Sequence, residues 1–222
     1  FKIESISKTC HVATMSGLRE KQKALRHDRI LESAARLFRE HGYEDVKMEA
    51  IAAEAEVAIG TIYNYYQNKG DLLVAIVSLE VEEVLKAGEA VIADPPSGLE
   101  AAVDALIGGY VAHSLHYLSK EMWRQAMAIS TTQPNSPFGE TYAALDVALA
   151  RQTCSLLAKL QDLGLLRPEA DAASIGEVIF NNTNMNFVIF VKSEQMSMDQ
   201  LRGLLHRQHS AILLGWIPST RP

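Results

Sequence analysis

The sequence has few of the residues that mark secreted or metal-binding proteins. Only two of its 222 residues are cysteines, Cys10 and Cys154, and they lie far apart in unrelated contexts. They form neither a disulfide framework nor a zinc-ligand spacing, and this usage suits a reducing compartment. We therefore expect a cytoplasmic protein that needs no metal and no cofactor.

Long hydrophobic runs and an excess of positive charge are also missing. The most apolar stretch, residues 178–191, is interrupted by four asparagines, so we expect no membrane-spanning segment. No cleavable signal sequence is recognisable, and residues 1–14, which precede Met15, read as an upstream extension. Because the net charge is −6, binding to nucleic acid would require a local basic patch.

What the sequence does have is helical periodicity throughout, which predicts an all-α fold. Apolar residues recur at a spacing of three and four from Ile30 to Phe38, and Gly42 follows where that helix should end. Asn68 and Asp71 resemble a capping box, and Ser97 is a candidate cap for the next helix. The later helices are expected at residues 48–55, 59–66, 69–93, 97–119, 121–129, 140–163, 172–192 and 199–214, with a loop at 131–139.

Residues 57–73, VAIGTIYNYYQNKGDLL, place a glycine and three tyrosines on one short helix. On a helical wheel Ile62 and Tyr66 face inward with Val57, which leaves Gly60 and Tyr63 on the outer face. Glycine in a helix interior costs about 1 kcal/mol relative to alanine, and close approach of the backbone to DNA would offset that cost. Hydroxyl and amide groups suit phosphate and base-edge contacts. With the short helix before it, this segment predicts a helix-turn-helix.

The run from Ile30 to Leu73 resembles the DNA-binding domain of TetR-family transcriptional regulators. The matching segments are ILESAARLFREHGYEDV, IAAEAEV and AIGTIYNYYQNKGDLL, about a fifth of the chain. The resemblance implies a homodimer that binds a pseudo-palindromic operator as a repressor and is released by a small-molecule effector. It divides the chain into an N-terminal extension and basic arm (1–24), a helix-turn-helix domain (25–72), and an effector-binding and dimerisation domain (73–222).

Carried onto this sequence, the resemblance implies a set of DNA-contacting residues: Lys47, Ile59, Gly60, Thr61, Tyr63, Asn64, Tyr65 and Lys69. Lys47 and Ala58 stand where the family often has a Ser or Thr cap, and Ile59 stands where a polar residue is usual. Residues 15–30 carry a net charge of +3 and form either a basic arm on DNA or a solvated extension of the first helix.

The C-terminal helices are expected to enclose an apolar pocket with a few polar groups. The candidate effector-binding residues, each of which also suits an ordinary core position, are Tyr110, His113, Tyr117, Trp123, Met127, Phe180 and Asn181. His113 and His116 have a spacing that metal ligands use, but a third ligand is missing, so we expect no metal site.

Asparagines at 181, 182, 184 and 186 are unusual within an apolar helix, because burying an unpaired amide is costly. In TetR-family proteins the last two helices usually form the dimer interface. Asn182 and Asn186 are therefore expected to hydrogen-bond across that interface, as a buried asparagine does in coiled coils. Asn181 or Asn184 is the alternative candidate for orienting an effector.

Two other classes of function compete with a regulator. One is a helical small-molecule carrier or enzyme whose N-terminal helices are only structural, and the other is a protein-binding adaptor. A structural cap has no use for exposed Gly60, Tyr63, Tyr65 and Lys69 together. These residues therefore favour a DNA-binding regulator. The sequence has no nucleophile–base motif and no phosphate-binding glycine loop, so we expect no enzyme activity.

Overall fold

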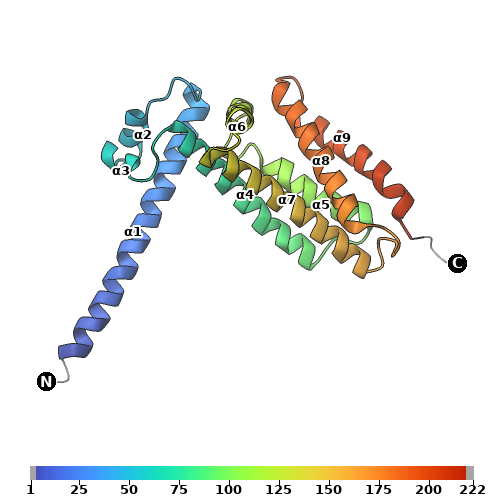
Figure 1. Cartoon of the computed structure of the whole chain (residues 1–222), viewed down its shortest axis with the longest axis horizontal. Coiled ribbons are helices and arrows are strands. Elements are labelled where there is room, and N and C mark those ends of the chain that lie inside the picture. Colours follow the sequence, from blue (N-terminus) through green and yellow to red (C-terminus); the bar gives the residue numbers. More distant parts are fainter. Residues whose placement is uncertain (1–3, 219–222) are drawn as a thin grey trace. The chain divides into compact units, whose positions relative to one another are not determined.

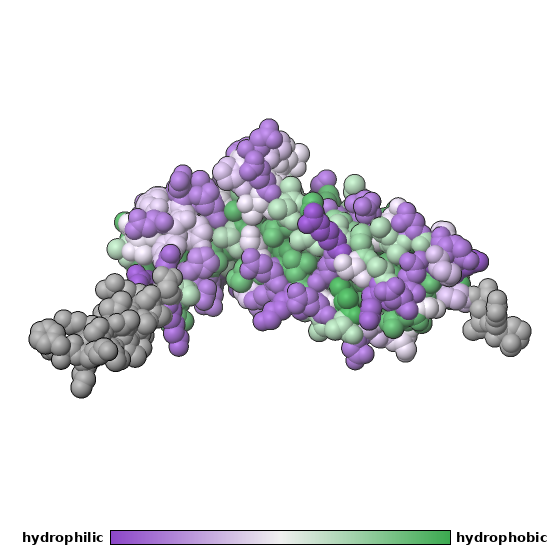
Figure 2. Space-filling model, turned by 60° about the horizontal axis from the view of Figure 1, so that its bottom comes forward, coloured by the Kyte–Doolittle hydropathy of each residue, from purple (hydrophilic) through white to green (hydrophobic). Residues whose placement is uncertain are grey.

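The computed structural model describes residues 4–218, with side chains from residue 21 onward, and within them every regular element is helical (Figure 1). The elements are α1 (Glu4–His41), α2 (Met48–Glu54), α3 (Ile59–Tyr63), α4 (Lys69–Ala93), α5 (Leu99–His113), α6 (Lys120–Thr132), α7 (Pro137–Asp162), α8 (Ala172–Lys192), α9 (Met198–Leu213) and a 3₁₀ turn (Leu214–Trp216). The predicted all-α class is confirmed. No helix in this part of the chain is long and apolar enough to cross a membrane. The face of the molecule shown in Figure 2 mixes hydrophilic and hydrophobic residues.

The chain divides into two compact units, residues 1–72 and 73–222. In the first unit, the periodic apolar residues of α1 pack against α2 and α3, and Ile30, Phe38, Ile51 and Ile62 are fully buried. Gly42 ends α1 as predicted. Its φ of 85° lies in the left-handed region that favours glycine, and its N–H donates to the Phe38 carbonyl at 3.0 Å.

The helix α1 begins at Glu4 and not near residue 30, so the basic residues between 21 and 29 lie on a helix and not on an irregular arm. The helix α3 is also shorter than predicted, since it ends at Tyr63 and Asn64 already forms its C-cap. Between α2 and α3, Glu56 has a φ of 51°, which makes the connection sharp.

In the second unit, α7 and α8 make the most extensive helix pair, and α8 also packs on α9 (Figure 1). Gly176 permits the close approach of α8 to α7, because a Cβ atom there would lie 2.7 Å from the Cα of Cys154. Hydroxyls of Ser119, Ser136 and Ser197 and the Asp171 carboxylate cap α6 to α9 by accepting from backbone N–H groups.

Two boundary predictions in this unit are wrong. Residues 131–139 are not one loop, because α6 continues to Thr132 and α7 already begins at Pro137, where proline suits the first turn of a helix. The helix expected at 97–119 begins after Gly98, with a φ of 110°, and ends at His113. Residues 114–119 leave the helix because the Ser114 carbonyl accepts from Trp123 Nε1 at 2.6 Å.

Candidate DNA-binding surface and ligand cavity

The predicted recognition helix presents its polar residues outward. Tyr63 is 47% exposed, whereas Ile62 is fully buried and Tyr66 is 6% exposed, as the helical wheel predicted. Asn64 is exposed, while Ile59, Thr61 and Tyr65 are partly exposed. Gly60 is exposed, and a Cβ added to it would meet no atom within 4 Å. Packing inside the chain therefore does not explain the glycine, and its backbone is free to approach a ligand.

Lys69 has a clear structural task in the first turn of α4. Its ammonium donates to the carbonyls of Tyr43 and Glu44 at 2.9 and 2.8 Å and lies 4.9 Å from the centre of the Tyr43 ring. These bonds tie the start of α4 to the segment before α2. Asn68 Oδ1 accepts from the Asp71 N–H at 3.1 Å, and Asp71 in turn accepts from the Gln67 N–H, so the predicted capping at this helix start is present.

Lys47 differs from two arginines of α1, Arg29 and Arg36, in that the arginines form ion pairs within the first unit. Lys47 is exposed at the N-cap of α2 and makes no capping hydrogen bond there. Arg36 is instead paired with Glu40 and Glu54, and Arg29 contacts the carboxylate of Glu56 at 3.7 Å. Ala58, the N-cap of α3, likewise provides no side-chain cap.

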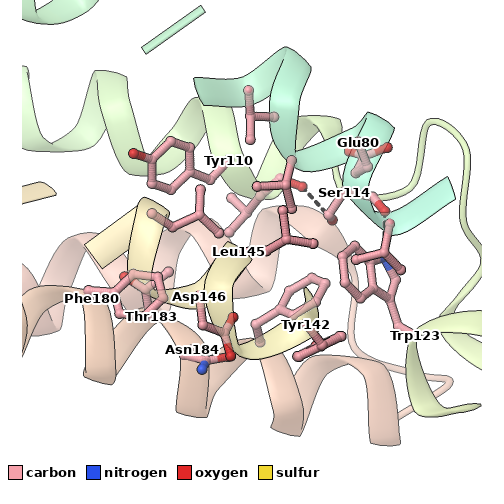
Figure 3. A pocket seen from close by; sticks show the side chains of 16 residues that line it. Glu80, Tyr110, Ser114, Trp123, Tyr142, Leu145, Asp146, Phe180, Thr183 and Asn184 are labelled. Carbon is pink, nitrogen blue, oxygen red and sulfur yellow. Dashed lines mark hydrogen bonds between the residues drawn. The ribbon is translucent and has the colours of Figure 1, made fainter. Parts of the chain in front are cut away.

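A cavity of about 80 Å³ lies inside the second unit, and five helices contribute to its wall (Figure 3). Its lining is mainly apolar and aromatic. The residues are Val77, Glu80, Val81 and Val84 from α4, Tyr110 and Val111 from α5, Ser114, Trp123 from α6, Tyr142, Leu145, Asp146 and Leu149 from α7, and Phe180, Thr183, Asn184 and Phe187 from α8. This composition is typical of a small-molecule site.

Three of the predicted effector residues, Tyr110, Trp123 and Phe180, line this cavity. Met127 lines an adjoining groove of about 660 Å³. Asn181 is exposed and lines neither space, whereas Asn184, the alternative candidate, lines both. Tyr142 and Asp146 were not among the predicted residues, although residues 142, 145, 146 and 149 share the helical spacing of one face.

The other two predicted residues, His113 and Tyr117, do not line the cavity but form hydrogen bonds with Glu80, which does. His113 Nδ1 lies 2.6 Å from Glu80 Oε1, and its Nε2 lies 3.1 Å from Glu83. The Tyr117 hydroxyl donates to Glu83 at 2.9 Å. Burial raises the pKa of Glu80, while the hydrogen bond from His113 opposes that rise. Glu80 is therefore a buried but well-partnered carboxyl group.

Most polar groups on the cavity wall are satisfied within the chain. The Tyr110 hydroxyl donates to Gln152 at 2.6 Å, and the Thr183 hydroxyl donates to the Ile179 carbonyl at 2.8 Å. The Ser114 hydroxyl donates to the Val111 carbonyl at 2.8 Å, the bond drawn in Figure 3. The O–H donor of each of these hydroxyl groups is therefore already used, and only the oxygen lone pairs remain to accept a hydrogen bond from a ligand.

Asp146 is different, because its carboxylate has no hydrogen-bond or ion-pair partner within the described part of the chain. Burial raises its pKa to about 6. Tyr142 and Asn184 also lack a hydrogen-bond partner there, and burial raises the pKa of the Tyr142 hydroxyl as well. These three residues are the ones that the cavity and the outer groove share.

Asn182 and Asn186 form hydrogen bonds within the chain. Both amide nitrogens donate to Gln208 Oε1 of α9 at 2.8 Å, and Asn186 also donates to the Asn182 carbonyl. Asn186 is buried, so its amide joins α8 to α9 inside the chain. The outward positions of α8 are apolar instead: Val178, Met185 and Ile189 are 50, 61 and 49% exposed.

Within the described residues, no group of three or more His, Cys, Asp or Glu side chains is arranged to hold a metal ion. The rings of His113 and His116 are in contact at a tilt of 33°, with their centres 4.9 Å apart. The candidate sites that the sequence predicted are the cavity of the second unit and the outer face of α2 and α3.

Comparison with known proteins places the first unit in a family context and the whole chain in a fold context. Residues 30–76 match the model of the family described as "Bacterial regulatory proteins, tetR family", which confirms the resemblance read from residues 30–73. The transcriptional repressor KstR of Rhodococcus jostii is 41% identical over 64 residues, which are 29% of this chain and 30% of that protein. A transcriptional repressor of Streptomyces coelicolor is 30% identical over 124 residues, 55% of this chain and 62% of that protein.

The chain thus spans about a third of the length of KstR and less than two thirds of the Streptomyces coelicolor protein. Solved structures extend the similarity in fold to most of the chain. A TetR-family regulator from Pectobacterium atrosepticum has a TM-score of 0.71 at 20% identity, covering 91% of this chain and 99% of that one. FadR from Bacillus subtilis, in complex with stearoyl-CoA, has a TM-score of 0.63 at 19% identity, covering 85% and 98%.

Proposed function

We propose, from the match of residues 30–76 to the TetR family of bacterial regulators, that the chain is a ligand-responsive transcriptional repressor. It acts as a homodimer on a pseudo-palindromic operator. The observation that carries the proposal is the outer face of α3, where an exposed tyrosine stands beside a glycine that no internal contact requires.

The DNA contacts follow from what each group offers. Gly60 lets the α3 backbone approach base edges closely, Tyr63 and Ile59 contact bases, and hydroxyl and amide groups of Thr61, Asn64 and Tyr65 donate to phosphates. Lys47 supplies a phosphate contact at the start of α2. Lys69 contributes chiefly by fixing the position of α4, because its ammonium already binds two carbonyls.

The dimer forms through α8 and α9. The exposed apolar residues Val178, Met185 and Ile189 lie on one stripe of α8, with spacings of seven and four residues. An exposed stripe of this kind marks a protein–protein interface. Two copies then hold their recognition helices about 34 Å apart, so that they enter successive major grooves.

The effector occupies the cavity of the second unit, and α4 carries the response. Val77, Glu80 and Val81 on α4 line the cavity, and Lys69 in the first turn of the same helix binds the carbonyls before α2. A shift of α4 on effector binding therefore changes the position of α2 and α3. Effector and DNA then oppose each other through a population shift between two states of one helix.

This role involves no catalysis and a cytoplasmic location, with operator DNA, a small molecule and a second copy of the chain as partners. Solved regulators of similar fold fit the ligand part of the proposal, since FadR from Bacillus subtilis was determined with stearoyl-CoA.

Selection from a random library of DNA duplexes tests the proposal. The full chain should enrich an inverted repeat whose half-sites are about one helical turn, or a multiple of it, apart. Tyr63→Ala should enrich no sequence, because the proposed base contact of Tyr63 is lost. The variant should still fold, since the Tyr63 side chain is exposed. If the wild-type chain enriches no motif at low salt, the proposed function is wrong.

A further inference from the structure

The inner cavity and the outer groove meet at one place, and its chemistry is distinct from the rest of the wall. Tyr142 and Asp146, four residues apart on α7, and Asn184 on α8 are the only residues common to the two linings. Figure 3 shows Asp146 next to Asn184, with the Tyr142 ring one helical turn away. We call these three residues the junction.

The junction has hydrogen-bonding capacity that the described chain does not use. Every other polar side chain of the cavity has a partner: Tyr110 bonds to Gln152, Trp123 to the Ser114 carbonyl, and Glu80 to His113. The junction offers two carboxylate oxygens, an amide oxygen and a phenolic oxygen, all of which accept hydrogen bonds. Asp146 is half-buried, so its carboxylate is only partly solvated, and a ligand that pairs with it compensates for the lost solvation.

The charge at the junction selects a cation. None of the described residues that line the cavity is Lys, Arg or His, whereas two of them are carboxylates. Burial raises the pKa of Asp146 to about 6, so its carboxyl group is mostly ionised above neutral pH. The groove contains two basic residues, Arg124 and Lys192. The guanidinium of Arg124 already binds Glu194 at 2.7 Å and the Val191 carbonyl at 2.6 Å, and Lys192 is exposed at the end of α8, eight residues beyond Asn184.

Aromatic rings near the junction favour a ligand whose uncharged part is apolar. The Trp123 and Phe187 rings meet edge to face at 5.2 Å between their centres, and Phe180 lies further along the same wall. Apolar and aromatic surface of this kind accepts an apolar body, and ring faces also attract a cation. An apolar cavity of about 150 Å³ holds one benzene molecule. The inner cavity, at about 80 Å³, is smaller, so we expect it to admit a body no larger than one ring, and only after its side chains move.

We infer that the effector is an organic amine, bound as its ammonium ion at Asp146, Tyr142 and Asn184 with a small aromatic or aliphatic body in the inner cavity. The ammonium donates its N–H groups to the junction oxygens, and the carboxylate of Asp146 balances its charge. The inference rests on the proposed function in taking this cavity as the effector site.

Three probes that share one phenylethyl body and differ in charge test the inference on the full chain. They are phenethylamine, phenethyl alcohol and hydrocinnamate, titrated calorimetrically at about pH 7.5, where the amine is protonated. The wild-type chain should bind the amine about tenfold or more tightly than the alcohol, and the anion most weakly.

Two variants on α7 separate the junction from general electrostatics. Asp146→Asn should lower the affinity for the amine about tenfold or more and leave that for the alcohol within about twofold. Asp162→Asn removes the same charge from an exposed position of the same helix and should change neither. Undetectable amine binding at millimolar concentration, tighter binding of the anion, or unchanged amine affinity in Asp146→Asn would each overturn the inference.

Amine binding is measured without DNA, so the experiment can contradict the amine effector without contradicting the regulator role, and the reverse also holds. A chain that binds an operator but discriminates no ammonium ion retains the regulator role and loses the amine effector. A chain that binds the amine through Asp146 but no DNA retains the junction as a binding site and loses the regulator role.

Discussion

The carboxyl group of Asp146 is half-buried, and this desolvation raises its pKa to about 6 from an ordinary value of 3.8. The folded state therefore binds this proton more tightly than the unfolded state does. Its favourable contribution to stability is present at low pH and is lost as the pH rises through 4 to 6. A residue that lowers stability at working pH is typical of a functional site.

Asp146→Asn should therefore stabilise the ligand-free chain above neutral pH. The gain expected at about pH 8 is about 1 to 3 kcal/mol, at about 1.4 kcal/mol for each pKa unit, and it should shrink toward about pH 4. Urea unfolding of both proteins across this range measures it. Asp162→Asn, the exposed control on α7, should change stability by less than about 0.5 kcal/mol. A variant less stable than wild type at pH 8 would contradict this reading of the site.

For single residues, burial or exposure was predictable from the sequence where it depends only on the helical face on which the residue lies. Tyr63 and Tyr66 are three positions apart, and the wheel correctly assigned the first to the surface and the second to the core. It missed Asp146, because burial of that carboxyl depends on α4, α6 and α8, which are distant in sequence. The internal hydrogen bonds of Asn182 and Asn186 depend on Gln208 of α9, which periodicity does not identify.

At the scale of elements, the helix α3 lacks an N-terminal cap. Ala58 has φ −65° and ψ 142°, an extended conformation that suits a capping residue, and it is exposed. Ala58→Ser should stabilise the chain by about 0.5 to 1 kcal/mol in thermal unfolding, because serine accepts from a free backbone N–H. The control Ala53→Ser, exposed within α2, should cost up to about 0.5 kcal/mol. Equal stability of the two variants would argue against this cap position.

Packing of α8 on α7 depends on Gly176. Gly176→Ala should destabilise the chain by about 1 to 3 kcal/mol, because the new methyl group would collide with the Cys154 backbone and thiol. Gly109→Ala is the matched change in α5, where a Cβ meets nothing within 4 Å, and it should stabilise by about 0.5 to 1 kcal/mol. Denaturant unfolding of both variants checks the pair; similar effects at the two positions would refute the packing argument.

Element boundaries were predictable where a local signal sets them. Gly42 ends α1, and α8 matches the predicted range of 172–192. The end of α5 at His113 was not predictable, because the Ser114 carbonyl accepts a hydrogen bond from the indole of Trp123, nine residues further along the chain. Tertiary hydrogen bonds of this kind override the helical preference of the sequence.

At the scale of the whole molecule, dimerisation through α8 predicts a clear change in mass. Replacing Met185 and Ile189 together by glutamate places two charges in the proposed interface and should yield a monomer in sedimentation experiments. Leu163→Glu is a suitable control, since Leu163 is 49% exposed at the end of α7. It should remain dimeric. A doubly substituted chain that still sediments as a dimer would exclude this face of α8 as the interface.

Operator binding is the claim on which the whole account depends, and the most direct test is fluorescence anisotropy on the selected duplex over a range of salt concentrations. Wild type should bind with a steep salt dependence, Tyr63→Ala should lose discrimination between operator and random DNA, and Lys47→Ala should reduce the salt slope by about one. Leu163→Ala should behave as wild type. If Tyr63→Ala and Lys47→Ala both bind the operator as wild type does, the outer face of α2 and α3 does not contact DNA, and the proposed function is contradicted.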